Sequence, residues 1–104
     1  DGVEYYLPAE HILFFETQDE QVYAHTARDV YRIKRRLYEL ERELPRVFVR
    51  VSKSAIVNTA RIYSVTRDFT GFSSVSQAHF RDTQKTIYIS RRYAATLRDA
   101  LGAY

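Results

Sequence analysis

The stretch Phe48-Val49-Arg50-Val51-Ser52-Lys53-Ser54-Ala55-Ile56-Val57-Asn58 is the most constrained part of the chain. The residues Val47–Val51 are mainly β-branched or aromatic, which is typical of a strand. The polar triplet Ser52-Lys53-Ser54 follows, and an apolar run then leads to Asn58. The stretch therefore predicts a strand that ends in a short polar turn.

Similar short runs of β-branched and aromatic residues recur along the chain, and their close spacing favours a mostly β (α+β) fold. Polar segments separate them and predict hairpins at 17–21 and 81–85 and a turn at Asp68–Gly71. The expected strands are Glu4–Leu7, Ile12–Glu16, Gln21–His25, Val30–Ile33, Val47–Val51, Ile62–Arg67, Val75–Phe80 and Thr86–Ile89.

Two segments have helical spacing instead. From Ile33 to Leu44 the apolar residues fall three and four apart with charged residues between them, and Pro45 follows, so we expect an amphipathic helix of about three turns there. Tyr93, Leu97 and Leu101 are four apart and precede Gly102, which predicts a short C-terminal helix over Arg92–Leu101.

The first of these helices has an unusual order of charges, with Lys34, Arg35 and Arg36 at its start and three glutamates toward its end. This order opposes the helix dipole. Pairing of Arg35 with Glu39, and of Glu39 with Arg42, on a solvated face explains the charges better than a partner does. These cations are therefore left out of the expected site.

The chain has 104 residues and a mass of 12.3 kDa, which predicts a single domain over 1–104. It has no run of about 18 apolar residues that could cross a bilayer, so no membrane insertion is expected, and its lack of cysteine suits the cytoplasm. Because it begins with Asp1 and not with Met, we expect a fragment of a slightly longer protein.

Charge divides the chain into two parts. Residues 1–27 contain six acidic residues and no Lys or Arg, whereas the remainder contains all 16 basic residues against seven acidic ones. The formal charges are thus −6 and +9, with a net charge of +3. An anionic partner such as a nucleic acid is expected to bind the basic part, although evenly spread surface arginines are the alternative.

Catalytic motifs are missing. His11, His25 and His79 have no metal-ligand spacing, and the three glycines form no phosphate-binding loop. The acidic run Glu39, Glu41 and Glu43 alternates in direction along a helix and gives no converging carboxylate pair. We therefore expect no enzyme activity, no cofactor and no metal.

Two stretches have residues suited to an anion. In Ser52-Lys53-Ser54, two hydroxyls flank a flexible cation at a strand end, a set that fits phosphate oxygens and base edges. A solvated turn in which one serine caps the next element explains the same residues equally well.

The second stretch is Tyr88-Ile89-Ser90-Arg91-Arg92-Tyr93, where a strand passes into the C-terminal helix. Ser90 is expected to be the N-cap, so that backbone N–H groups and two guanidinium groups face one point. Cations are disfavoured at a helix start, which indicates a negative partner. Salt bridges from these arginines to Asp99 or to the acidic N-terminal part are the alternative.

Together these stretches resemble the LytTR DNA-binding domain of bacterial transcriptional regulators. The resemblance covers nearly the whole chain, and the ordered set of pieces carries it, since no single piece is diagnostic. The matching pieces are Ile12–Glu16, Val22–Thr26, Leu37–Glu41 with Leu44-Pro45, Phe48–Asn58, Ile62 and Ser90–Tyr93.

The resemblance implies an elongated, mostly antiparallel β structure whose loops enter successive major grooves of DNA. It also implies binding to tandem direct repeats in promoters, often as two protomers. The family motif His-Arg-Ser corresponds here to Ser52-Lys53-Ser54, so Lys53 keeps the cation but loses the planar guanidinium, and base discrimination there is expected to differ.

Further roles follow from the same resemblance. Arg91 matches a base-reading arginine, while Ser52, Ser54, Ser90 and Arg92 are expected at phosphates or the groove rim. Arg50 and Arg67 are secondary phosphate candidates. Asn58 is expected to hold the turn after the apolar run, and the acidic loop Thr17–Gln21 is not expected to touch DNA.

The Ser-Lys-Ser and Ser-Arg-Arg-Tyr variants resemble a subgroup of stand-alone regulators that lack a receiver domain. In that subgroup a small membrane protein is thought to regulate the DNA-binding protein, so a protein contact and not phosphorylation is the expected input. The alternative function is a protein-interaction module that pairs through strand edges and aromatic residues such as Tyr5, Tyr6, Tyr63 and Phe72.

Overall fold

Eight strands and two α-helices are found in the parts of the chain that the computed structural model describes, residues 6–70 and 73–102. Single-turn 3-10 helices precede the first strand (η1, Ala9–His11) and join the fifth strand to the sixth (η2, Thr59–Arg61). The other elements are β1 (Phe14–Gln18), β2 (Gln21–His25), β3 (Val30–Ile33), α1 (Leu37–Glu43), β4 (Phe48–Ser52), β5 (Ala55–Asn58), β6 (Ile62–Thr70), β7 (Ser73–Phe80), β8 (Thr83–Ile89) and α2 (Arg91–Leu101).

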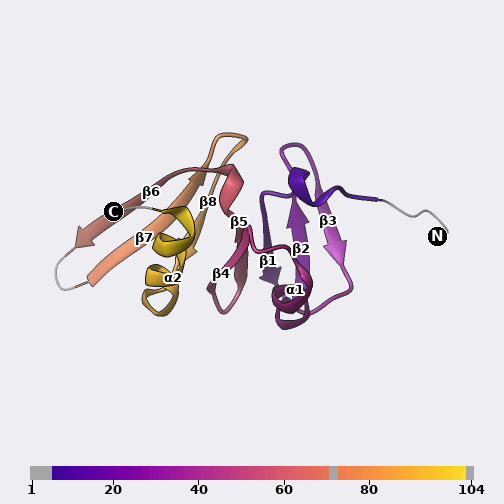
Figure 1. Cartoon of the computed structure of the whole chain (residues 1–104), viewed down its shortest axis with the longest axis horizontal. Helices are drawn as coiled ribbons and strands as arrows, with labels where there is room; N and C mark the ends of the chain where they lie inside the picture. Colours follow the sequence, from indigo (N-terminus) through magenta and orange to yellow (C-terminus); the bar gives the residue numbers. More distant parts are fainter. Residues whose placement is uncertain (1–5, 71–72, 103–104) are drawn as a thin grey trace.

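The strands form two antiparallel sheets. Sheet A has the order β3-β2-β1-β5-β4, and sheet B has the order β6-β7-β8. In the centre of sheet A, Phe14 pairs with His25 on one side and with Val57 on the other. The two sheets lie end to end and make an elongated body of 51 × 27 × 26 Å (Figure 1), as the resemblance implies.

Sheet A is covered on both faces, because neighbouring side chains of a strand point to opposite sides. Phe15 and Ile56 pack against α1, whereas Phe14 and Val57 face sheet B and α2. Phe14 is fully buried, and its ring stacks on His25 at 4.4 Å and lies 5.3 Å from Phe80 of β7. Phe14 therefore lies in the core that the two sheets share.

Asn58 fixes the passage from sheet A toward sheet B. Its side chain is 2% exposed, its Nδ2 donates to the carbonyl of Ile12 at 2.9 Å, and its Oδ1 accepts from the amide of Ala60 at 3.0 Å. The expected structural role of Asn58 is confirmed, since both halves of the amide are used to hold the chain as it leaves β5.

The first helix is shorter than expected. The interpretation of Ile33–Leu44 as one helix is wrong at its start, because Ile33 pairs with Val22 as the last residue of β3. Lys34 and Arg35 thus precede α1, which reduces the conflict with the helix dipole, although Arg36 is at the N-cap and Glu43 is the last helical residue. The Glu39 carboxylate accepts from the backbone amide of Arg36 at 2.8 Å, which caps the helix start.

Strand β5 escapes the sequence prediction because all four of its residues are buried and show no alternation. The turn expected at Asp68–Gly71 is displaced, since β6 continues to Thr70, and Gly71 lies outside the described residues. Of the strand expected at Glu4–Leu7, Glu4 and Tyr5 lie outside the described residues, and Tyr6 and Leu7 belong to no strand.

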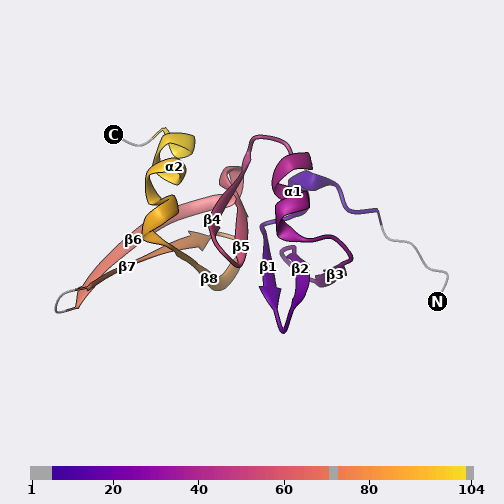
Figure 2. The ribbon, with the colours of Figure 1, turned by 90° about the horizontal axis from the view of Figure 1, so that it is seen from below.

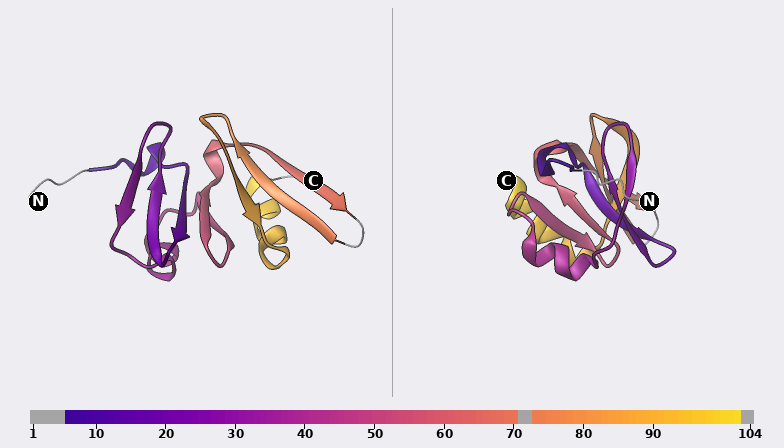
Figure 3. Two further views of the ribbon diagram at one scale, coloured as in Figure 1. Left: turned by 180° about the vertical axis from the view of Figure 1, so that it is seen from behind. Right: turned by 90° about the vertical axis from the view of Figure 1, so that its right-hand side faces the viewer.

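Three connections meet along one long edge of the molecule, which is drawn at the bottom of Figure 1 and is called the lower edge here. They are the β1–β2 turn (Asp19 and Glu20), the β4–β5 turn (Lys53 and Ser54) and the β8–α2 junction (Ser90). The view from below in Figure 2 looks onto this edge, and the view from behind in Figure 3 keeps it at the bottom.

Candidate nucleic-acid interface

The two stretches that the sequence selects lie side by side on the lower edge. The amide of Ser90 donates to the carbonyl of Val51 at 2.8 Å, which ties the β8–α2 junction to the end of β4. Leu97 of α2 packs in the same core cluster as Val51 and holds the helix there. Segments that are separated by almost 40 residues thus form one continuous surface.

The β4–β5 turn presents Lys53 and Ser54 to solvent and buries Ser52, which is 6% exposed. The Ser52 hydroxyl accepts from the amide of Ser54 at 3.1 Å, so Ser52 has the turn-capping role that the sequence left open. Within the described residues the Lys53 ammonium makes no hydrogen bond or ion pair.

The start of α2 carries the other exposed cations. Ser90 is at the N-cap position, as predicted, but its hydroxyl is buried and makes no hydrogen bond within the described residues, which does not fit the phosphate contact expected of it. Arg91 and Arg92 are exposed, and the Arg92 guanidinium lies 5.5 Å from the Tyr93 ring centroid. Neither arginine pairs with Asp99 in the described part of the chain, so the salt-bridge alternative to Asp99 receives no support.

Arg50 points back into the protein. Its Nε and Nη2 donate to the carbonyls of Ser52 and Lys53, both at 2.7 Å, and its Nη1 lies 2.8 Å from a Glu41 carboxylate oxygen of α1. The sequence reading missed Glu41, since the only signal is its place in an acidic run whose other members pair elsewhere.

Arg67 lies apart from the turns, on the outer strand of sheet B. It stands opposite Ser76, which in turn stands opposite Ile89, so two strand spacings separate Arg67 from the end of β8. It lines a cavity beside α2 together with Arg98 and Leu101. The structure therefore places seven of the eight expected residues around the turn and the junction, and Arg67 elsewhere.

The β1–β2 turn adds negative charge to the lower edge. The amide of Thr17 donates to the carbonyl of Ser54 at 2.8 Å, which brings this turn next to the β4–β5 turn. Asp19 and Glu20 have φ values of 52° and 66°, a two-residue turn in the left-handed region. The two acidic side chains thus stand beside the basic part of the lower edge, and the absence of a DNA contact by this loop stays a prediction.

The cations before α1 are partly used within the protein. Arg35 pairs with Glu43, and its Nε lies 3.9 Å from a Glu39 carboxylate oxygen, which confirms the predicted Arg35–Glu39 pair. These exposed pairs contribute little to stability. They reduce the charge that this segment can offer to a partner.

A charged group is half-buried between the two sheets. The Glu16 carboxylate lies 3.3 Å from His25 Nε2 and 2.6 Å from Lys85 Nζ of β8. Burial lowers the pKa of His25 from 6.5, Glu16 opposes this effect, and Lys85 adds to it. The fold therefore favours the neutral form of His25.

This arrangement predicts a pH dependence of stability. The unfolded chain binds a proton at His25 more readily than the folded chain, so the free energy of unfolding should fall as pH drops from about 7.5 to about 5.5. Urea unfolding at the two pH values measures this fall, which the variant His25→Phe should reduce, whereas His11→Gln, at an exposed site, should keep it. An equal fall in His25→Phe and the unaltered chain would contradict the assignment.

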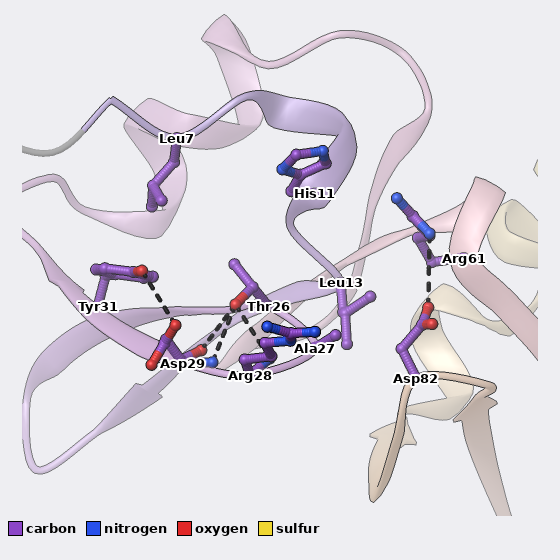
Figure 4. A pocket seen from close by; sticks show the side chains of 10 residues that line it. All are labelled: Leu7, His11, Leu13, Thr26, Ala27, Arg28, Asp29, Tyr31, Arg61 and Asp82. Atoms are coloured by element: carbon purple, nitrogen blue, oxygen red, sulfur yellow. Dashed lines mark hydrogen bonds and ion pairs between the residues drawn. The ribbon is translucent and has the colours of Figure 1, made fainter.

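The opposite, upper edge has a different character. A cavity of about 290 Å³ opens there between the β2–β3 connection and the β7–β8 turn (Figure 4), and it contains none of the eight expected residues. Arg61 and Asp82 form an ion pair of 3.6 Å at one side of this cavity. Among residues 6–70 and 73–102, no three His, Cys, Asp or Glu side chains are grouped as a metal site would need.

The chain matches the family model described as the LytTr DNA-binding domain over residues 4–102. Its fold is similar to that of a solved LytTr DNA-binding domain from Bacillus cereus, with a TM-score of 0.81 and 25% sequence identity over 92% of this chain and 85% of that one. The antiparallel sheets and the two helices agree with that architecture.

Curated relatives include proteins of Staphylococcus aureus strains NCTC 8325 and COL that are named as HTH-type transcriptional regulators. Each is 34% identical over 90 residues, which is 86% of this chain and 58% of the relative. The chain thus spans less than two thirds of their length. The longer of the two described α-helices has 11 residues, and none in this part of the chain could cross a membrane.

Proposed function

The chain belongs to the family of LytTr DNA-binding domains, and on that premise we propose that its lower edge binds double-stranded DNA sequence-specifically as part of a bacterial transcriptional regulator. The hydrogen bond from Ser90 to Val51 is the observation that carries the proposal, because it joins two cationic segments into one surface. Both segments project from rigid strand and helix ends.

In this proposal Lys53 and Arg91 reach base edges, since both are exposed and without an internal partner among the described residues. Arg91 can bind guanine in a bidentate manner, whereas the Lys53 ammonium donates as a point charge. Ser54 and Arg92 bind phosphates, with the backbone N–H groups at the start of α2, whereas the buried Ser90 hydroxyl is not assigned a phosphate. Ser52 holds the Ser54 backbone by accepting from its amide. A phosphate contact by Arg67 stays a prediction.

Turns are the elements that enter the grooves in this mode. The two α-helices are separated by β4 to β8, so the described chain has no helix-turn-helix pair. The β4–β5 turn and the β8–α2 junction instead enter major grooves on one side of the duplex. Two protomers bind the direct repeats of a promoter, and regulation by a small membrane protein is a further expectation for the full-length protein.

Fluorescence anisotropy tests the proposal with a duplex that the chain selects from a random-sequence pool and a scrambled duplex of the same composition. We expect tighter binding to the selected duplex, and log K should fall with log salt by about 0.9 for each phosphate contact.

The interaction-module alternative rests on exposed aromatics such as Tyr6 and Tyr63. It predicts no selection of a sequence and no binding to either duplex at low salt, which would overturn the proposal.

A further inference from the structure

At the end of β4 and through the β4–β5 turn, all four carbonyl oxygens from Val51 to Ser54 accept hydrogen bonds from inside the protein. The carbonyl of Val51 accepts from Ser90, and the carbonyl of Ser54 accepts from Thr17, both at 2.8 Å. The two carbonyls between them accept from the Arg50 side chain at 2.7 Å. The partially negative oxygens thus point inward, and the side chains of Lys53 and Ser54 point outward.

The Arg50 guanidinium is at the centre of this arrangement. Its side chain is only 16% exposed, and each of its three nitrogens has a separate oxygen partner. The third partner, Glu41, is on α1, so one side chain connects the helix under sheet A to the turn. A planar group with fixed donors suits such a three-way contact.

We propose that Arg50 and Glu41 form a clamp that positions the β4–β5 turn for sequence reading, with Arg50 acting as a positioning residue and not as a phosphate contact. This inference rests on the proposed function, because the clamp serves the turn that presents Lys53. It replaces the phosphate role that the sequence suggests for Arg50 with one that its internal contacts support.

The positioning role and the phosphate-contact role of Arg50 predict opposite results for two substitutions. Arg50→Lys keeps the positive charge, but a lysine cannot reach two carbonyls and a carboxylate together. Glu41→Ala removes a negative charge near the DNA, which by charge alone strengthens binding. The variant Glu43→Ala is the matched control, since it makes the same charge change on the same helix without touching the clamp.

Anisotropy with the selected and scrambled duplexes separates the roles. We expect Arg50→Lys to lower the preference for the selected duplex by about tenfold, the lower range for loss of a base contact. Glu41→Ala should lower it by about threefold, while Glu43→Ala keeps the preference of the unaltered chain. Full preference in Arg50→Lys, or Glu41→Ala behaving like Glu43→Ala, would overturn the clamp.

Amide hydrogen exchange tests the clamp without DNA. The amide of Thr17 donates to Ser54 of this turn, and the amides of Ser54 and Ser90 donate to Ser52 and Val51, the last two residues of β4. They should exchange at least about tenfold faster in Arg50→Lys and Glu41→Ala than in Glu43→Ala. If the unaltered chain selects no DNA sequence, the proposed function fails, and these exchange rates alone decide whether the clamp exists: equal rates in all variants rule it out.

Discussion

Replacing Lys53 and Arg91 together by alanine is expected to weaken binding to the selected duplex by about 2–6 kcal/mol, because each base contact contributes about 1–3 kcal/mol. The two side chains lie on separate elements and have no interaction partner in common among the described residues, so their effects should add approximately. Affinity for the scrambled duplex should fall much less, through loss of charge alone. The double variant should therefore bind the two duplexes almost equally.

The matched control removes two cations from other parts of the surface. Arg28 lines the upper-edge cavity, and Arg98 is in the last turn of α2, far along the helix from Arg91. We expect Arg28→Ala with Arg98→Ala to weaken binding to both duplexes equally and to keep the preference for the selected duplex. If Lys53→Ala with Arg91→Ala also weakens binding to both duplexes equally, the base-reading roles are wrong and the two cations bind phosphates.

Replacing Phe14 by alanine is expected to lower the free energy of unfolding by about 3–5 kcal/mol, the range for a buried phenylalanine. The side chain is fully buried between the sheets, where it stacks on His25 and lies near Phe80. The free energy of unfolding of a small domain is about 5–15 kcal/mol in total, so this single substitution removes a large share of it. Urea unfolding followed by circular dichroism measures the loss.

Tyr88→Ala is a suitable comparison for Phe14→Ala. Tyr88 is also an aromatic residue of a strand, but its side chain is 55% exposed on β8. We expect its loss to change stability by about 0.5 kcal/mol or less. Similar losses in both variants would mean that the sheets do not depend on the Phe14 contact.

The elements with clear alternation or helical spacing are the ones that the sequence predicts well. The expected bounds Gln21–His25 and Val30–Ile33 agree with β2 and β3, and the C-terminal helix differs by one residue at its start. The errors have a common cause, since β5 is buried on both faces and Ile33 is assigned by its pairing with Val22. Burial and pairing are properties of the tertiary structure, which local spacing does not reveal.

The candidate site could be predicted in part, because residue type and local position are visible in the sequence and tertiary contacts are not. Residue type and position indicated that Lys53 and Arg91 would be exposed cations at the ends of strands, and both are exposed there. The burial of Ser52 and the inward direction of Arg50 depend on contacts with Ser54 and Glu41. Such contacts form only when β4, β5 and α1 are packed together.

The length of the domain can be compared with the length of the DNA that it would cover. The longest axis of 51 Å runs parallel to the lower edge in Figure 1, and at about 3.4 Å per base pair it spans about 15 base pairs. A helical turn of about 34–36 Å is shorter than the domain. Two copies laid along the same face of a duplex would therefore overlap if their centres were one turn apart, and their centres fit two turns apart, at about 21 base pairs. Under the proposed binding mode, with the lower edge along the duplex axis, the length of the domain sets the minimum spacing between two copies bound on the same face of the DNA.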